Sequence, residues 1–244
     1  MTNKTILVTG GSSGVGKMIV ENLASDGNKV ITLARRFERL EQLYFHRDNV
    51  YCYAADLSDL SNLASVLENI HKEHGDIYYV INCAGVMQSG AVEDLSVQDW
   101  NYSICVNAYA PLEIVRSFLP GMKKTNFGRI INLTSGAPLN CFPKYSSYSA
   151  SKGVLNALTV TLAKELTAFD IKINLMSPGP VRSEMAPDAP MEPEVCLPTL
   201  NYLLNDTMES GSFFWLGCKI PLFPDLGDID WLAGIGSDKV NKIL

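Results

Sequence analysis

Short apolar segments alternate with segments of helical spacing six times along this chain of 244 residues. The helical segments carry their apolar residues on one face, and the short segments have the length and composition of strands. The expected strands span residues 5–9, 29–33, 50–54, 76–81, 128–133 and 171–175. Strands joined through helices run parallel, because each helix carries the chain back to the same end of the sheet. The alternation therefore predicts an α/β fold with a doubly wound parallel sheet and helices on both faces.

The composition is that of one globular domain. Hydrophobic residues make up 47% of the chain and charged residues 19%, which is enough apolar material for one large core. We therefore expect residues 1–244 to form a single domain. The net charge is −6, and basic residues gather only in pairs, so we expect no binding to nucleic acid.

No targeting or membrane segment is recognisable. The chain has no run of about 18 apolar residues that could span a bilayer, and the apolar stretch after Lys4 is too short for a signal peptide. The six cysteines lack the spacing of a metal site or redox motif, so we expect reduced, mostly buried thiols in a cytoplasmic protein. His71 and His74 lie at a polar helix end without other ligands, and we expect them to be solvated and to bind no metal.

A glycine-rich turn follows the first strand and precedes a helical segment that begins at Lys17. A strand, a glycine turn and a helix in this order expose backbone N–H groups and a helix N-terminus to an anion. A nucleoside-triphosphate loop is excluded, because Met18 stands where that loop needs a hydroxyl for Mg²⁺. The spacing suits the pyrophosphate of a dinucleotide instead; the alternative is a turn with a purely structural role. The residues expected at the pyrophosphate are Gly10, Ser12, Ser13, Gly14, Val15 and Gly16.

The end of the second strand indicates which dinucleotide binds. A fold that binds NAD places an acidic residue there, which hydrogen-bonds the ribose 2′-hydroxyl. Here Ala34 takes that position, and Arg35 and Arg36 follow it. Guanidinium groups match the 2′-phosphate of NADP(H) in charge and geometry. We therefore expect NADP(H) as the cofactor; the alternative is a pair of surface arginines at the start of a helix.

Three further strand ends carry polar or small residues. Asp56 and Leu57 follow the third strand, where the carboxylate could accept a hydrogen bond from the adenine amine or cap the helix that begins near Asp59. The small residues at 82–85 follow the fourth strand and let the backbone approach a cofactor closely. Ser135 follows the fifth strand, at the edge where open parallel sheets bind their ligands.

Tyr148 and Lys152 stand four residues apart at the start of an apolar helical segment. At this spacing both side chains project from the same face of the helix. An ammonium group beside a phenol stabilises the phenolate and lowers its pKa toward neutral pH, where acid–base catalysis is efficient. The alternative is an ordinary tyrosine and a solvated lysine on an amphipathic helix.

A proline interrupts the long helical segment between residues 98 and 122. Pro111 has no N–H group to give to the carbonyl of Asn107. We therefore expect that carbonyl to be unpaired, the helix to kink, and a water molecule to find a place there. The alternative is a tolerated kink without catalytic meaning.

These motifs together resemble the short-chain dehydrogenase/reductase family over about residues 4–216. The resemblance rests on the glycine turn, on Asn82-Cys83-Ala84-Gly85, in which Cys83 replaces the usual second asparagine, and on Tyr148-x3-Lys152. It implies a Rossmann-like sheet of about seven strands, the seventh at 212–216. It implies catalytic roles for Asn107, Ser135, Tyr148 and Lys152, and cofactor contacts for Asn82, Ala84, Gly85, Tyr148, Lys152, Pro178, Gly179, Val181 and Ser183.

The resemblance also implies an activity, that of an NADPH-dependent carbonyl reductase or alcohol dehydrogenase acting on a small molecule. In this family mechanism Tyr148 exchanges the proton and Ser135 hydrogen-bonds the substrate oxygen. Lys152 holds the nicotinamide ribose, and the Asn107 carbonyl anchors a water that links Lys152 to solvent. The alternatives are an NAD-linked alcohol dehydrogenase, and a catalytically silent, NADP-sensing regulatory protein, which would be expected to have lost Tyr148, Lys152 or Ser135. A homodimer or homotetramer, assembled through the helices near 99–122 and 147–168, is implied as well.

Two segments depart from the family pattern. The segment after Ser183, where the family has a variable substrate lid, is short and rich in proline, which favours a stiff, extended cover. The tail at 217–244 is apolar and irregular, and apolar surface of this kind is seldom left in water. We expect it to be a strap that packs on its own subunit or on a neighbour; the alternative is a wall of the substrate pocket, which would suit a bulky or hydrophobic carbonyl.

Overall fold

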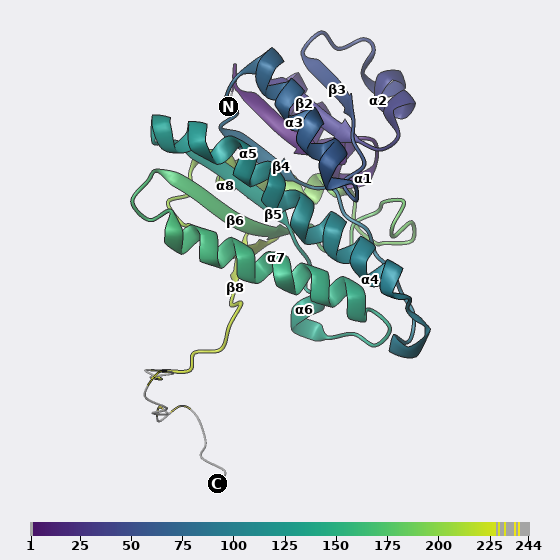
Figure 1. The fold of residues 1–244 in the computed structure, drawn as a ribbon, viewed down its shortest axis with the longest axis vertical. Coiled ribbons are helices and arrows are strands. Elements are labelled where there is room, and N and C mark those ends of the chain that lie inside the picture. The colour runs from purple at the N-terminus through teal and green to yellow at the C-terminus, as the bar shows by residue number, and fades with distance from the viewer. Residues whose placement is uncertain (1, 228, 230–231, 233–236, 238, 240–244) are drawn as a thin grey trace.

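The computed structural model describes residues 2–227, 229, 232, 237 and 239. These residues form one sheet of eight strands in the order β3-β2-β1-β4-β5-β6-β7-β8 (Figure 1). The strands are β1 (Thr5–Thr9), β2 (Lys29–Ala34), β3 (Val50–Ala54), β4 (Tyr79–Asn82), β5 (Gly128–Leu133), β6 (Ile171–Ser177), β7 (Phe213–Trp215) and β8 (Cys218–Ile220). Strands β1 to β7 run parallel, and β8 runs antiparallel to β7. The predicted doubly wound parallel sheet is confirmed, with one more strand than expected.

Helices cover both faces of the sheet (Figure 1). The α-helices are α1 (Gly14–Ser25), α2 (Phe37–Tyr44), α3 (Leu60–His74), α4 (Val97–Ile104), α5 (Ala110–Thr125), α6 (Ala137–Asn140), α7 (Ser146–Glu165) and α8 (Leu197–Asn205). Two 3₁₀ turns, η1 (Val92–Asp94) and η3 (Pro193–Cys196), and the π-turn η2 (Cys105–Tyr109) complete the set. The core on one face packs α1, α2 and α8 against the sheet, and the core on the other packs α3, α5 and α7.

The central strands are buried on both faces, which is why they were recognisable as apolar segments. Every residue of β4 and of β5 is buried, and strands with both faces covered carry nearly continuous apolar runs. Helix α1 begins earlier than the expected Lys17, because the N–H of Lys17 already donates to the Ser13 carbonyl at 3.1 Å. The last two glycines of the turn, Gly14 and Gly16, therefore belong to the first turn of the helix.

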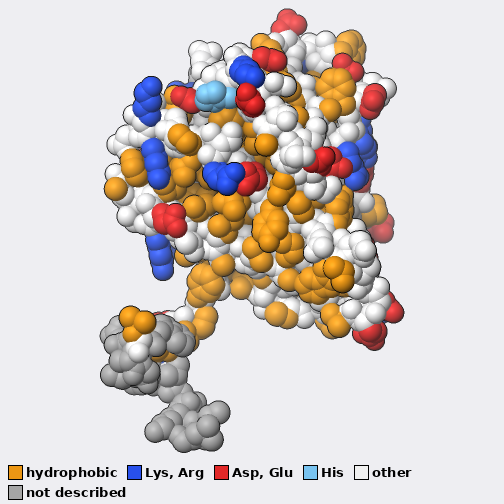
Figure 2. Space-filling model, viewed as in Figure 1, with side chains coloured by type: hydrophobic (Ala, Val, Ile, Leu, Met, Phe, Trp, Pro, Cys, Tyr) orange, Lys and Arg blue, Asp and Glu red, His pale blue; other side chains and the backbone are white. Residues whose placement is uncertain are grey.

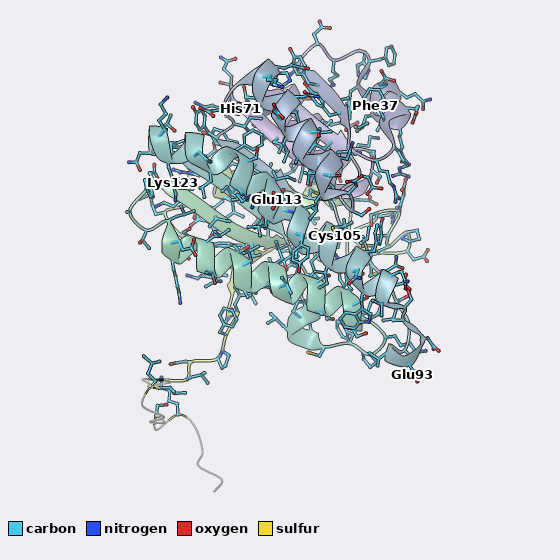
Figure 3. The ribbon with its side chains drawn as sticks, in the orientation of Figure 1. Phe37, His71, Glu93, Cys105, Glu113 and Lys123 are labelled. Atoms are coloured by element: carbon cyan, nitrogen blue, oxygen red, sulfur yellow. The ribbon has the colours of Figure 1, made fainter. Side chains whose placement is uncertain are left out.

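The predicted interruption of the long helix is present as a π-turn between α4 and α5. The N–H of Ala110 donates to the carbonyl of Cys105, five residues earlier, where an α-helix would bond four residues back. Figure 3 labels Cys105 at this junction. Pro111 follows within the first turn of α5, where its missing N–H costs little. The role expected for the Asn107 carbonyl stays a prediction.

Two predictions about titratable side chains were wrong. His74 is not solvated: its side chain is 3% exposed, its Nε2 lies 2.7 Å from the Tyr53 hydroxyl, and burial lowers its pKa. His71 is half exposed, as expected. The cysteines are all free, but only Cys196 is buried, because most of the others lie at strand ends and in loops rather than under helices.

The first residues of the expected tail belong to the body of the protein. The segment 218–220, expected to be irregular, forms β8 and pairs with β7. Ile220 and Leu222 pack against a small cluster around Leu155 and Phe213. The strap interpretation therefore holds for this short stretch, which packs on its own subunit.

Beyond Leu222 the described chain leads away from the sheet (Figures 1 and 2). Phe223 is 59% exposed, and Trp231, one of the apolar residues of the tail, lies outside the described residues. Among the described residues no helix has the length and apolar character needed to cross a membrane.

Candidate active site

A cavity of about 1250 Å³ opens at the carboxyl ends of the strands, where the sheet order reverses between β1 and β4. This reversal leaves a crevice in which doubly wound sheets bind their ligands. All the predicted site residues line this cavity except Asn82 and Asn107. The structure thus brings together segments that are separated by more than a hundred positions in the sequence.

The glycine turn lies against the end of β4 so closely that side chains do not fit. A Cβ on Gly10 would come within 2.9 Å of the Ala84 Cα, and one on Gly16 within 2.2 Å of the Gly10 carbonyl oxygen. Thr9 holds the two strand ends together, because its hydroxyl accepts hydrogen bonds from the N–H groups of Cys83 and Ala84, each at 3.0 Å. The turn is therefore fixed before any ligand binds.

The adenosine end of the cavity carries the two predicted arginines, which differ in their contacts. Arg35 donates to the Tyr102 hydroxyl at 3.0 Å, across the cavity mouth. Arg36 points to the glycine turn, with its Nη2 3.2 Å from the Ser13 hydroxyl. Its Nη1 lies 2.9 Å from a carboxylate oxygen of Glu184. Of the two, Arg36 is the one held next to the turn.

Asp56 does not cap the following helix. Asp59 is the N-cap of α3, with its carboxylate accepting hydrogen bonds from the N–H groups of Ser61 and Asn62. The Asp56 carboxylate accepts instead from the N–H and the hydroxyl of Ser58, at 2.9 and 2.7 Å. It closes a local turn at the cavity wall, so the capping alternative is wrong.

The other end of the cavity holds the predicted catalytic side chains. Tyr148 and Lys152 extend from the first turns of α7, and Ser135 follows the end of β5. Ser135 lies beside the Tyr148 phenol and lowers its pKa, against the larger effect of burial. Lys152 is 4% exposed, and its ammonium group donates to the Leu133 carbonyl at 2.8 Å.

The pKa values of this cluster differ from the expectation. Burial raises the pKa of Tyr148, and Ser135 lowers it only in part. Burial also lowers the pKa of the Lys152 ammonium to about 8. The prediction that Lys152 pulls the phenol pKa toward neutrality is therefore wrong for this arrangement, because desolvation of the phenol is the larger effect. The neutral phenol is a proton donor.

Asn107 supports the site from behind the cavity wall. Its side chain is fully buried, accepts from the Val86 N–H at 2.9 Å, and donates to the Val86 carbonyl at 2.8 Å. It also donates to the Ser151 hydroxyl at 2.9 Å. Asn107 therefore ties the loop after β4 to α7, next to Lys152.

Asn82 also lies behind the wall. Its amide donates to the Asn132 side chain at 2.8 Å, and Asn132 in turn donates to the Thr159 hydroxyl at 2.9 Å. This chain of buried side chains links β4, β5 and α7. Asn82 therefore supports the strand ends and does not line the cavity.

The apolar side chains of Phe142, Phe213 and Trp215, which the sequence already indicated as apolar surface near the substrate, line the cavity. Trp215 packs on the substrate-side segment, so that a Cβ on Gly179 would lie 2.7 Å from its indole nitrogen. Ile220 lines the cavity as well. Glu184, also part of the lining, pairs with Arg39. Because these two residues are 145 positions apart, no local pattern in the sequence indicates their pairing.

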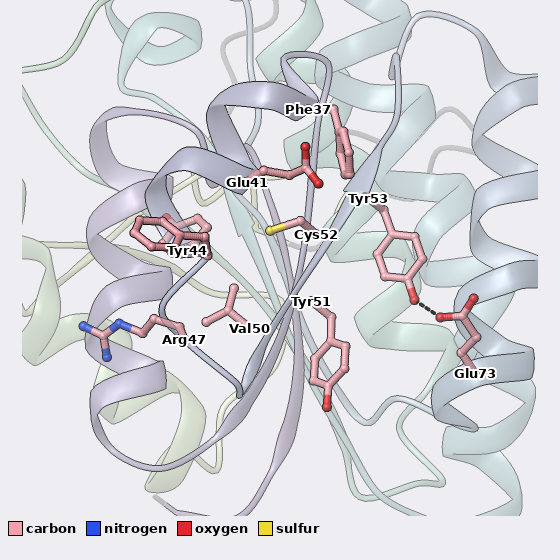
Figure 4. Close-up of a pocket in the computed structure, with 10 residues that line it drawn as sticks. Phe37, Glu41, Tyr44, Arg47, Val50, Tyr51, Cys52, Tyr53 and Glu73 are labelled. Carbon is pink, nitrogen blue, oxygen red and sulfur yellow. Dashed lines mark hydrogen bonds between the residues drawn. The ribbon is translucent and has the colours of Figure 1, made fainter.

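A second cavity, of about 430 Å³, lies at the outer edge of the sheet between α2 and β3 (Figure 4). It contains none of the predicted site residues. The hydroxyl of Tyr53 bonds to the Glu73 carboxylate at its rim. Tyr44 lies on its inner wall and donates to the Gly11 carbonyl at 2.7 Å, which supports the glycine turn.

Comparison with known proteins shows which family the chain belongs to. A family model described as short chain dehydrogenase matches residues 4–193. The chain belongs to that family. An uncharacterised oxidoreductase of Staphylococcus epidermidis is 31% identical to this short-chain dehydrogenase over 183 residues, which cover 75% of this chain and 80% of that protein.

Solved structures of the family are similar in fold. A metagenomic short-chain oxidoreductase in complex with NADP is 28% identical, with a TM-score of 0.78 over 88% of this chain and 97% of the other. A 4-hydroxyisoleucine dehydrogenase complexed with NADH is 26% identical, with a TM-score of 0.83 over 87% of this chain and 96% of the other.

The cavity of this short-chain dehydrogenase fits the nicotinamide dinucleotide that the family binds. The bare glycine turn at the start of α1 offers N–H groups to a pyrophosphate. Lys152 has three N–H donors and gives one of them to Leu133, so donors remain for ribose hydroxyls. The cavity lining includes both Arg36 and Tyr148.

Proposed function

We propose that this short-chain dehydrogenase is an NADPH-dependent carbonyl reductase, acting in reverse as an alcohol dehydrogenase. One observation carries the proposal. The hydroxyls of Tyr148 and Ser135 and the ammonium of Lys152 converge at one end of a cavity whose other end carries Arg36. Such an arrangement can orient a carbonyl, donate a proton to it, and hold a phosphorylated adenosine at the far end.

The roles of the residues follow from their environment. NADPH supplies the hydride when it is bound. Tyr148, neutral because its pKa is raised by burial, donates its proton to the substrate oxygen. Ser135 donates a hydrogen bond to the same oxygen and stabilises the charge that develops on it. Lys152 and Tyr148 hold the nicotinamide ribose, and Asn107 keeps the loop after β4 in place.

The proposed preference for NADP(H) rests on Arg36, held beside the glycine turn by the Ser13 hydroxyl. A second candidate, an NAD-linked alcohol dehydrogenase, is favoured by one observation. The Glu184 carboxylate lies beside Arg36, and carboxylates at this end of the fold accept the ribose 2′-hydroxyl of NAD. The relative complexed with NADH is consistent with that candidate.

The substrate end of the cavity supports a bulky or hydrophobic carbonyl as substrate. Its lining is largely apolar and aromatic, with Trp215 and Phe142 on the walls. Ile220, in β8, also lines the cavity, which supports the wall alternative for this short part of the tail.

We also propose a homodimer or homotetramer in the cytoplasm. Figure 2 shows apolar side chains over the face that contains α5 and α7. Tyr109, the last residue of η2 before α5, is 51% exposed in the single chain, and Val154 within α7 is 40% exposed. The six free cysteines are consistent with a reducing compartment.

Binding of NADPH and NADH, measured by fluorescence titration, tests the cofactor assignment. We expect wild-type protein to bind NADPH more tightly, and Arg36→Ala to weaken NADPH binding by about tenfold or more while leaving NADH binding unchanged. Arg116→Ala, an exposed arginine on α5, is the matched control and should change neither. Equal or tighter binding of NADH by wild-type protein would favour the NAD-linked enzyme.

A further inference from the structure

Glu184 lies between two arginines at the adenosine end of the cavity. One carboxylate oxygen is 2.9 Å from Nη1 of Arg36, and the other accepts a hydrogen bond from Arg39. The three side chains are 45%, 39% and 49% exposed for Arg36, Arg39 and Glu184. Glu184, which lies 145 residues after Arg39 in the sequence, thus supplies the carboxylate that the end of β2 lacks.

This ion-pair cluster connects the two sides of the nucleotide groove. On one side Arg36 also donates to the hydroxyls of Ser12 and Ser13, at 3.4 and 3.2 Å. On the other side the residue before Glu184 lies over the glycine turn, because a Cβ on Gly14 would come within 2.9 Å of the Ser183 Cβ. Glu184 is therefore placed to hold its segment across the groove.

The segment that carries Glu184 is a compact turn. The N–H of Ser183 donates to the Ala186 carbonyl at 3.2 Å, and the N–H of Ala186 donates back to the Ser183 carbonyl at 3.1 Å. Residues 183–186 all line the cavity. Glu184 is the residue through which this turn contacts Arg36 and Arg39 on the other side of the groove.

We propose that Glu184 is a latch: its carboxylate occupies Arg36 and Arg39 before the cofactor binds, and the 2′-phosphate of NADP(H) displaces it. The proposal rests on the proposed function, because it requires NADP(H) to bind at these arginines. Binding of the phosphate then frees residues 183–186 from the far side of the groove. NADH, whose ribose is uncharged, leaves the latch closed.

Charge and geometry favour this exchange. A phosphate monoester carries up to two negative charges and three acceptor oxygens, so it satisfies two guanidinium groups better than one carboxylate does. The carboxylate and the phosphate repel each other at the same arginines, so both cannot stay. Ion pairs as exposed as these are weak, and the carboxylate is easily replaced.

The Glu184→Gln variant tests the latch directly, because it removes the charge and keeps the shape of the side chain. We expect its dissociation constant for NADPH to fall by about threefold or more, while that for NADH is unchanged. Glu192→Gln is the matched control. Glu192 pairs with Arg182 at 2.9 Å in the same region, and both partners are equally exposed, so this variant should change neither constant.

The outcomes separate the latch from the proposed function. An unchanged NADPH constant in Glu184→Gln would overturn the latch, even if wild-type protein prefers NADPH. Weaker NADH binding by the variant would also overturn it, since Glu184 would then be an acceptor for the ribose 2′-hydroxyl. Tighter binding of NADH than of NADPH by the wild-type protein would instead overturn the proposed cofactor preference. The change in the dissociation constant for NADPH between wild type and Glu184→Gln would still test the latch.

Hydrogen exchange of the wild-type protein provides a second measurement that needs no variant. Adenosine 2′,5′-bisphosphate presents the phosphate without the nicotinamide half. We expect it to increase amide exchange at residues 183–186, whereas adenosine 5′-monophosphate should not. Equal exchange with both probes would overturn the latch.

Discussion

At the scale of single residues, the phenol of Tyr148 is held in its neutral form. Burial raises its pKa, and the partial compensation comes from Ser135 and not from Lys152. Lys152 is itself buried among the strand ends and donates to the Leu133 carbonyl. The two residues therefore share a helix face, as their spacing predicted, while their electrostatic relation is set by how much water surrounds them.

The raised pKa of Tyr148 predicts how the two directions of the reaction depend on pH. Reduction needs the protonated phenol and should keep its rate from neutral into alkaline pH. Oxidation needs the phenolate, so its rate should rise with pH over the same range. Initial rates in both directions between pH 6 and 10, a range set by the ordinary tyrosine pKa of about 10, measure this; an oxidation rate independent of pH would contradict it.

Tyr148→Phe is the control for that profile. This variant keeps the ring and removes the proton donor, so turnover should fall by at least about 10²-fold, the lower end of a general acid–base contribution. Cofactor binding should persist, and the remaining oxidation rate should lose its dependence on pH. Turnover close to wild type with intact cofactor binding would show that another group transfers the proton.

At the scale of elements, the π-turn η2 places a buried amide where two other elements meet. Asn107 lies in this turn, between the loop after β4 and the start of α7. A turn that is wider than an α-helical one changes which side chains face inward, so the residues before and after it point to different neighbours. The position of Pro111 in the sequence indicated that the long helix is interrupted. It did not indicate which contacts Asn107 makes from the turn.

Asn107→Ala should therefore lower stability as well as activity. The substitution leaves the partly buried N–H and carbonyl groups of Val86 without their side-chain partner, which costs about 1–3 kcal/mol when such groups lose their partner. The free energy of unfolding in urea measures the loss. Asn101→Ala is the matched control, since Asn101 lies exposed on the preceding helix α4. A loss of activity with unchanged stability would contradict a supporting role for the Asn107 side chain.

At the scale of the whole molecule, the sheet is continued past the strand that was expected to be the last. Strand β8 covers the edge of β7 through antiparallel pairing and brings Ile220 into the cavity wall. Edge strands with unpaired backbone groups are a liability that proteins cover in several ways. The segment after β7 therefore both covers the edge of the sheet and lines part of the cavity.

Two truncations separate these contributions. Deleting residues 218–244 removes β8 and Leu222, exposes the edge of β7, and should lower the thermal midpoint by several degrees, on the order of 2–4 °C for each kcal/mol lost. Deleting 223–244 keeps the packed stretch and should cost much less. Thermal denaturation and size-exclusion chromatography of both proteins measure this. Equal losses in the two would mean that residues after Leu222 stabilise the protein, in one subunit or between subunits.

The sequence alone determined the parallel sheet, the glycine turn and the positions of Tyr148, Lys152 and Ser135 at strand and helix ends, because each depends on residues close together in the chain. Local spacing decides which side chains share a face, and alternation of strands and helices indicates a parallel sheet with helices on both faces. These predictions needed no knowledge of distant contacts. They covered the strands up to β7 and fewer than half of the residues that line the cavity.

Only the tertiary structure decided what depends on burial and on distant partners. Whether His74 is solvated, which way the Tyr148 pKa moves, and that Asn82 lies behind the cavity wall all follow from how much protein surrounds each group. The contact of Glu184 with Arg36 and Arg39 joins segments that no local pattern relates. Desolvation and long-range pairing are properties of the packed chain, since both depend on residues that only folding brings together.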